Sequence, residues 1–119
     1  SLSHSGTWVL CAVGGSPLGV DIELPRCTIQ LARRFFHPQE TASVEALPPS
    51  MQPEALCRLW VAKEAVIKAM HGIRELTLSE VEILADEQGA PFCTLPGVQV
   101  SIAHEREYAI AYALVEANG

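Results

Sequence analysis

The chain has 119 residues, a size typical of one domain, and 49% of them are hydrophobic, which is enough to form a core. Its formal net charge is −6, and the few basic residues form no stripe, which argues against general nucleic-acid binding. No stretch reaches the roughly 18 consecutive apolar residues of a membrane span, and no segment resembles a signal peptide.

The cysteines are spread along the chain and form no CxxC pair. Their spacing is typical of small core residues in a reducing compartment, and it favours neither a disulfide framework nor a zinc site. We therefore expect a cytoplasmic protein with no membrane association, whose four cysteines are Cys11, Cys27, Cys57 and Cys93.

In chain order, the hydrophobic pattern predicts both strands and helices. Apolar, β-prone stretches bounded by Gly and Pro predict strands at residues 7–13, 18–24, 78–84, 91–95 and 98–114. Apolar residues three and four apart, with Thr28 and Gly72 at suitable ends, predict helices at residues 28–36 and about 53–71. Residues 37–47 are expected to form a further turn or helix. The expected fold class is α+β, with a small antiparallel sheet packed against a long helix.

The long helix carries a lysine where an apolar residue is expected. At about 100° per residue, Lys63 falls at the centre of the apolar arc, and Glu64 and Lys68 fall together on its flank. The arc itself consists of Leu56, Leu59, Trp60, Val66, Ile67 and Met70.

The two ends of the chain resemble each other. Residues 1–13 align without a gap on residues 101–113, and the alignment pairs Ser1 with Ser101 and His4 with His104. Two interpretations remain open: chance similarity between short strands, or a repeat. In the second, residues 1–119 form one domain with one structural repeat, preceded by the last strand of another, and a partner copy completes the fold or the site.

Three acidic residues are candidates for metal binding. Asp21 and Glu23 lie two apart on a predicted strand, so they share a face with Cα atoms about 7 Å apart. Two like charges there are costly unless a hard cation lies between them, although a solvated acidic strand is the simpler alternative. Glu64 offers a third carboxylate, or merely an i,i+4 pair with Lys68.

The combination of these segments is more specific than any of them alone. GVDIE at 19–23 and WVAKEAVIKA at 60–69 resemble the two signature motifs of the 4′-phosphopantetheinyl transferase superfamily. LARRFFHPQE at 31–40 resembles the element that lies between those motifs, and SLSHSGTWVLCAV at 1–13 resembles the strand before the first motif in surfactin-type members.

This resemblance implies transfer of the phosphopantetheine arm of coenzyme A to a serine of an acyl or peptidyl carrier protein, with release of 3′,5′-ADP. It implies Mg²⁺ binding by Asp21, Glu23 and Glu64, with Glu64 also as the general base. It further implies that the coenzyme A phosphates are contacted by Lys63, Lys68, Ser3 and His4, with Lys68 also acting in catalysis. The lysine-bearing helix face would then line a phosphate-binding cleft.

The departures from the family concern completeness. Surfactin-type members are longer and have two similar halves, whereas this chain matches only the second half and the last strand of the first. Its ending, VSIAHEREYAIAYAL at 100–114, resembles instead that of the short trimeric holo-acyl-carrier-protein synthases, except that Ala103 replaces the usual serine. His104 is therefore either a phosphate contact in an oligomer or an ordinary strand histidine. We expect a homo-oligomer or a lobe of a pseudodimer.

Carrier proteins of this class are acidic, so docking on a chain of net charge −6 requires a local basic surface. The candidates for that surface are Arg26, Arg33 and Arg34, followed by Arg58 and Arg74. Each of them is equally well explained as a solvated arginine. Two other functions remain open: a non-catalytic lobe that binds coenzyme A and metal, and a magnesium-dependent phosphohydrolase that uses the same carboxylates.

Overall fold

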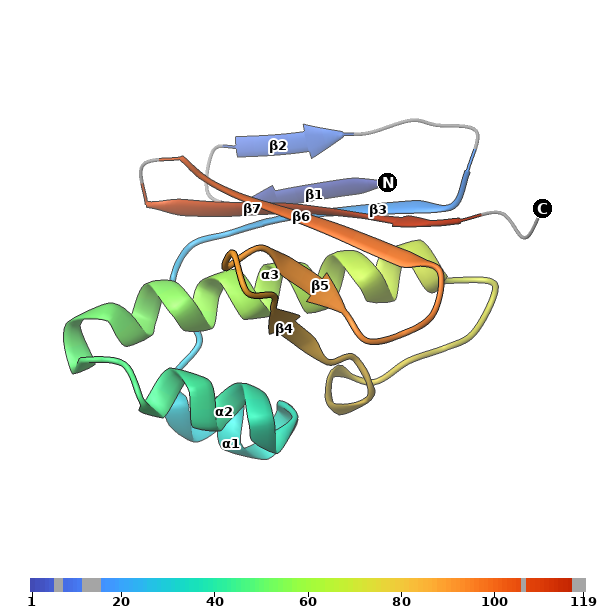
Figure 1. The fold of residues 1–119 in the computed structure, drawn as a ribbon. Coiled ribbons are helices and arrows are strands. Elements are labelled where there is room, and N and C mark those ends of the chain that lie inside the picture. The colour runs from blue at the N-terminus through green and yellow to red at the C-terminus, as the bar shows by residue number, and fades with distance from the viewer. Residues whose placement is uncertain (6–7, 12–15, 106, 117–119) are drawn as a thin grey trace.

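A three-stranded antiparallel sheet with one long helix on its face forms the centre of the molecule (Figure 1). The computed structural model describes residues 1–5, 8–11, 16–105 and 107–116, and for residues 4, 5, 8–11 and 105 only the backbone. The strand order is β3-β7-β6. These elements are β3 (Leu18–Glu23), β6 (Val98–Glu105), β7 (Tyr108–Val115) and the helix α3 (Gln52–Met70). The predicted α+β class is confirmed.

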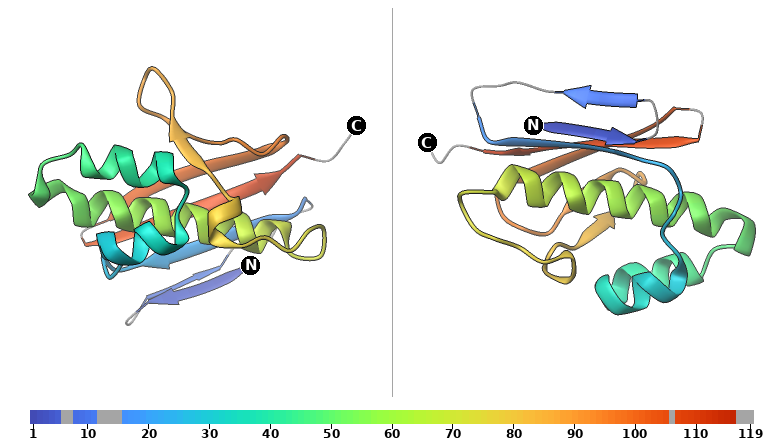
Figure 2. Two further views of the ribbon diagram at one scale, coloured as in Figure 1. Left: turned by 90° about the horizontal axis from the view of Figure 1, so that it is seen from below. Right: turned by 180° about the vertical axis from the view of Figure 1, so that it is seen from behind.

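The remaining elements surround this centre. A hairpin, β1–β2, lies beside β3, and two short helices gather at the N-terminal end of α3 (Figure 2). A second hairpin, β4–β5, precedes β6. Their bounds are β1 (Leu2–Ser5), β2 (Trp8–Cys11), α1 (Ile29–Phe35), α2 (Pro38–Glu45), β4 (Ile83–Ala85) and β5 (Pro91–Cys93), with 3-10 turns at Pro49–Met51 and Leu78–Glu80. In the described part of the chain no helix is long and apolar enough to cross a membrane.

Local side-chain interactions set the helix ends. The hydroxyl of Thr28 accepts a hydrogen bond from the amide of Leu31 and so caps α1, as its position in the sequence predicts. His37 and Glu40 form a reciprocal capping box at the start of α2. Helix α3 ends just before Gly72, whose φ of +87° is favoured only for glycine.

Small residues let α3 approach the sheet closely. Alanines of α3 face alanines of β7, and all of them are buried: Ala62, Ala65 and Ala69 on the helix and Ala109, Ala111 and Ala113 on the strand. Gly19 of β3 lies against the helix backbone, because an added Cβ there would overlap the carbonyl oxygen of Ala65 and lie 2.5 Å from the amide nitrogen of Ala69. Glycine is therefore required at this position of the GVDIE motif.

Three predicted strands differ from the structure. The pattern predicted a strand at 7–13, and the resemblance treated residues 1–13 as one final strand of a repeat, but the described residues form the hairpin β1–β2. The segment predicted at 98–114 forms two strands, β6 and β7. The strand predicted at 78–84 is only β4, because Thr77 and Glu80 cap each other and bend the chain into a 3-10 turn.

The sequence similarity between the two ends has a structural counterpart. In the first hairpin Leu2 is paired with Cys11 and Ser3 with Leu10, and in β6–β7 Ile102 is paired with Ala111 and Ala103 with Ile110. The two hairpins thus have the same register at the offset given by the sequence alignment. This agreement favours a repeat over chance similarity, while the origin of residues 1–13 in a preceding repeat stays a prediction.

We expect Gly19→Ala to destabilise the fold by about 3 kcal/mol, because the helix backbone cannot move aside without disturbing the alanine layer. The control is Gly89→Ala, where the added Cβ meets open space and only the φ of +83° opposes it, at a cost of about 1 kcal/mol. Urea unfolding followed by circular dichroism measures both losses. Equal losses would contradict the close approach of β3 and α3.

Candidate active site

The site is built where β3 and α3 meet. Asp21 and Glu23 both point from β3 toward α3, opposite Ala111 and Ala109 of β7, whose small side chains leave room for carboxylates. Glu64 lies on the adjoining part of α3, and the charges of Asp21 and Glu23 act on it. The structure therefore brings together the three acidic residues that the sequence analysis selected.

The two oxygens of Asp21 have different surroundings. Its Oδ1 accepts hydrogen bonds from the hydroxyl of Ser3 at 2.8 Å and from the ammonium of Lys68 at 3.1 Å. Its Oδ2 is buried and has no hydrogen-bond partner among the described residues. An unpartnered buried carboxylate oxygen is costly, which indicates that a further cation or donor belongs there.

Lys68 is held by three oxygen atoms. Its Nζ donates to the carbonyl oxygens of Leu2 and Val20 and to Oδ1 of Asp21, each at 3.1 Å. These bonds connect α3 to both β1 and β3. The expected contact between Lys68 and a phosphate stays a prediction. In this structure the lysine forms an ion pair with Asp21.

Burial and the charge of Asp21 raise the pKa values of the two glutamates. The pKa of Glu64 is raised mainly by desolvation and then by the charge of Asp21. The pKa of Glu23 is raised by the same two causes in the same order, and Arg26 opposes the shift. A carboxylate with a raised pKa is a better proton acceptor, which suits Glu64 to the role of a general base.

The expected magnesium site stays a prediction. In the part of the chain that the structure describes, no three His, Cys, Asp or Glu side chains are placed so that they could hold a metal ion. The donor chemistry nevertheless fits a hard divalent cation, because the charge of Asp21 acts on both Glu23 and Glu64 and raises their pKa values, and Oδ2 of Asp21 is buried without a partner among the described residues. Asp21 is the residue at which the fit is best.

The expectation for Lys63 needs correction. Its side chain is fully buried, and its Nζ lies 2.6 Å from Oε1 of Glu40 and also donates to the carbonyl oxygen of Val81. Glu40 in turn accepts a hydrogen bond from the amide of Ile83 at 2.7 Å. Lys63 therefore faces a closed interior between α2, α3 and β4 rather than an open cleft, and it is not brought to Asp21.

Besides the two lysines, the three other residues expected to contact phosphate are placed differently from one another. Ser3 is buried and donates its hydroxyl to Oδ1 of Asp21. His4 belongs to β1, but its side chain lies outside the described residues. His104 is on β6, which β7 separates from β3, and its Nδ1 lies 3.7 Å from Glu54 with no hydrogen bond. Within this chain His104 is not brought into contact with the site carboxylates of Asp21, Glu23 and Glu64.

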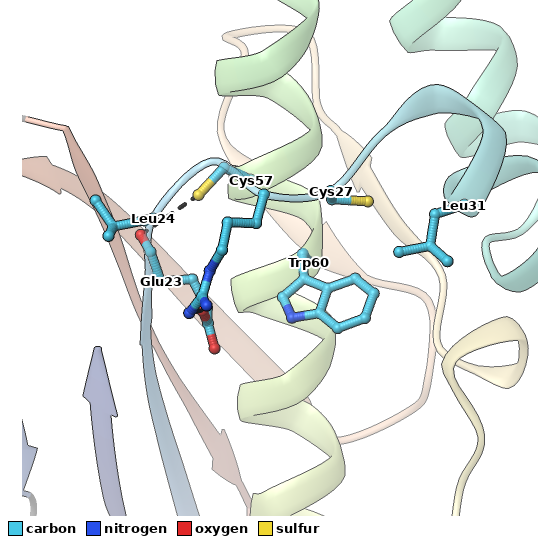
Figure 3. A pocket seen from close by; sticks show the side chains of 7 residues that line it. Glu23, Leu24, Cys27, Leu31, Cys57 and Trp60 are labelled. Atoms are coloured by element: carbon cyan, nitrogen blue, oxygen red, sulfur yellow. Dashed lines mark hydrogen bonds and ion pairs between the residues drawn. The ribbon is translucent and has the colours of Figure 1, made fainter. Parts of the chain in front are cut away.

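An apolar pocket of about 300 Å³ opens beside Glu23 (Figure 3). In Figure 3 the indole of Trp60 forms one wall of the pocket, and the thiol of Cys57 donates to the backbone oxygen of Glu23 at 3.5 Å. Burial raises the pKa of both Cys27 and Cys57 to about 11, so these thiols stay protonated and are poor nucleophiles. The lining residues are Glu23, Leu24, Arg26, Cys27, Leu31, Cys57 and Trp60.

Sequence reasoning missed this pocket because its walls come from three segments that are adjacent only in the fold. The one available signal was Trp60 within WVAKEAVIKA, which the helical pattern assigned to the apolar arc. A second cavity, of about 400 Å³, lies on another side of α3 and includes Glu54 and Arg58 but none of the three carboxylates.

Comparisons with known proteins agree with the motifs. A family model described as the 4′-phosphopantetheinyl transferase superfamily matches residues 17–113. A 4′-phosphopantetheinyl transferase of Bacillus subtilis is 36% identical over 81% of this chain and 43% of its own length. A holo-[acyl-carrier-protein] synthase of Geobacillus kaustophilus is 36% identical over 84% of this chain and 85% of its own.

A solved structure from Chronobacterium ammoniagenes, an ACPS–CoA complex, has a TM-score of 0.70 at 25% identity and covers 89% of this chain and 100% of that one. This chain thus spans less than half of the B. subtilis relative but most of the shorter synthases.

The buried ion pair leads to a stability prediction. Lys63→Met would leave the Glu40 carboxylate buried without its cation, which we expect to cost about 3–5 kcal/mol. The double variant Lys63→Met/Glu40→Gln removes that unpaired charge and should lose less than Lys63→Met alone. Urea unfolding measures both variants.

Lys68→Met is the matched control on the same helix. Its ammonium is partly exposed, so we expect a smaller loss of stability than for Lys63→Met. A larger loss for Lys68→Met would contradict the assignment of Lys63 to the interior.

Proposed function

Because the chain belongs to the 4′-phosphopantetheinyl transferase superfamily, we propose that it transfers the 4′-phosphopantetheine moiety of coenzyme A to a serine of an acyl or peptidyl carrier protein. The observation that carries the proposal is the gathering of Asp21, Glu23 and Glu64 at the junction of β3 and α3, where an oxygen of Asp21 is buried without a partner. The shorter holo-[acyl-carrier-protein] synthases supply the precedent for the reaction in chains of about this length.

In the proposed mechanism the chain positions its substrates and handles one proton. Glu64 accepts the proton of the carrier serine, whose oxygen then forms a bond to the phosphorus of the pantetheine phosphate. The bond between the two phosphates of coenzyme A breaks, and 3′,5′-ADP leaves. Mg²⁺, held by Asp21, Glu23 and Glu64 when bound, would neutralise charge on the pyrophosphate. Lys68, at 3.1 Å from Asp21, holds positive charge at the same place.

The surface next to the pocket suits an acidic carrier protein. Two of its arginines are engaged with carboxylates: Arg26 lies 3.3 Å from Glu23 and Arg33 lies 3.1 Å from Glu45. Arg34 has no acidic partner within the described residues and lies over the ring of Phe35, which is 40% exposed. We propose that the carrier docks on α1, with its serine entering beside Glu23.

We propose that further protein, either a second copy or a partner lobe, completes the site, because no three acidic, His or Cys side chains among the described residues are placed to hold a metal ion and Oδ2 of Asp21 lacks a partner there. A non-catalytic lobe that binds coenzyme A and metal is therefore the second candidate function. Size-exclusion chromatography at several protein concentrations, with and without coenzyme A, separates the two. Self-association promoted by coenzyme A favours the enzyme, whereas a monomer that binds no coenzyme A favours the lobe.

The transferase activity is tested by labelling an apo carrier protein with fluorescent coenzyme A in the presence of Mg²⁺. Loss of the proton acceptor in Glu64→Gln should lower kcat by about 100-fold or more. Glu54→Gln is the matched control, because Glu54 is an exposed acid on the same helix and lines the second cavity instead of the site. Undiminished labelling by Glu64→Gln would refute its role as the base.

Charge reversal tests the docking surface. Arg34→Glu should raise the KM for the carrier about tenfold without changing the KM for coenzyme A, because it repels an acidic partner. The effect should shrink as salt rises. Arg74→Glu, beyond the C-terminal end of α3 and paired with Glu80, is the control. Equal effects of the two variants would argue against docking on α1.

A further inference from the structure

Ser3 has no hydroxyl proton to offer a phosphate in this structure. Its side chain is 5% exposed, and its single hydroxyl proton is donated to Oδ1 of Asp21 at 2.8 Å. The hydroxyl oxygen of Ser3 itself accepts a hydrogen bond from the amide of Ile22 at 3.0 Å. Because a serine hydroxyl has one donor, this arrangement fixes its direction toward Asp21.

The contact determines how the Asp21 carboxylate is presented. Ser3 and Lys68 both bind Oδ1, from β1 and α3 respectively, so the carboxylate is held from two sides at one oxygen. The other oxygen, Oδ2, is left without a partner. A carboxylate held in this way keeps one oxygen available for a cation and loses the freedom to rotate.

Comparison with the hairpin β6–β7 shows that this arrangement is particular to β1. Ser1 accepts a hydrogen bond from the amide of Val20, and Ser3 accepts one from the amide of Ile22, two residues further along β3. In the hairpin of identical register at the other end of the chain, Ser101 corresponds to Ser1, but Ala103 corresponds to Ser3. Alanine has no hydroxyl, so a β6 strand placed beside β3 could not hold Asp21.

We infer that Ser3 is a positioning residue that orients the Asp21 carboxylate for a divalent cation, and that the N-terminal hairpin is a working part of the site. The inference rests on the proposed function only for the role of the cation in the reaction. The orientation of Asp21 follows from the two hydrogen bonds of the Ser3 hydroxyl. It replaces the expectation that Ser3 contacts phosphate.

The test measures metal binding and substrate kinetics separately. Mn²⁺ binding to the full chain without coenzyme A, followed by electron paramagnetic resonance, should weaken about tenfold in Ser3→Ala, which is typical of losing a partner that orients a metal ligand. The KM for coenzyme A at saturating Mg²⁺ should stay within about twofold. Ser3→Thr, which keeps the hydroxyl, should restore Mn²⁺ binding.

Two variants control for the hairpin itself. Ser1→Ala removes the hydrogen bond to Val20 without touching Asp21, and Ala103→Ser adds a hydroxyl at the corresponding position of β6. Both should bind Mn²⁺ as the unmodified chain does. If Ser1→Ala weakens Mn²⁺ binding as much as Ser3→Ala, the effect is one of hairpin docking and the inference is wrong.

The remaining outcomes are also decisive. A raised KM for coenzyme A with unchanged Mn²⁺ affinity in Ser3→Ala would assign Ser3 to phosphate and overturn the inference. Absence of Mn²⁺ binding by the unmodified chain would overturn it as well. If that chain binds Mn²⁺ but labels no carrier protein, the proposed transferase activity fails while the role of Ser3 is still decided by the binding comparison.

Discussion

At Gly19 the backbone of β3 lies directly against the backbone of α3, with no room for a Cβ between them. The alanines of α3 and β7 extend this close approach along the interface. As a result, carboxylates two residues apart on the strand face a carboxylate on the helix at short range. A larger residue at the contact would separate the two elements and with them the acidic group.

Gathering three acids in a partly buried position is electrostatically unfavourable, and the chain offsets the cost unevenly. Lys68 neutralises Asp21 on one side of α3, while Lys63 neutralises the buried Glu40 on another. The two lysines are five residues apart, which places them about 140° apart around the helix axis. The same helix, α3, therefore supplies one cation to the site and a second cation to the structural interior. The two roles cannot be exchanged without rotating the helix.

The N-terminal hairpin contributes to the same balance. Hydrogen bonds to serine hydroxyls, rather than a continuous ladder of backbone hydrogen bonds, connect it to β3. It also supplies a hydroxyl to Asp21 and a carbonyl oxygen to Lys68. Strand β1 thus takes part in the site that β3 and α3 begin. Its repeat at the C-terminal end shares the register but lacks the hydroxyl. Two hairpins with the same register therefore differ in whether they can hold Asp21, and a single side chain, Ser3 or Ala103, makes the difference.

Much of this arrangement was accessible from the sequence. The α+β class, the capping of α1 by Thr28 and the selection of Asp21, Glu23 and Glu64 follow from local signals: strand alternation, helix periodicity and short motifs. That these three acidic residues lie close together could be expected only from the resemblance of the motifs to those of the transferase superfamily, because no local rule brings residue 64 to residue 21.

The sequence by itself determined which residues could form helices and strands and which acids could share a face, since these properties depend on neighbours along the chain. The tertiary structure alone decided the partners. Periodicity placed Lys63 on the apolar arc, but only packing revealed Glu40, from α2, as the counter-charge that makes its burial possible. Likewise Ser3 became a partner of Asp21 only when β1 lay beside β3. Hydrogen bonds and ion pairs between distant segments depend on three-dimensional proximity, and the spacing of residues along the chain does not contain it.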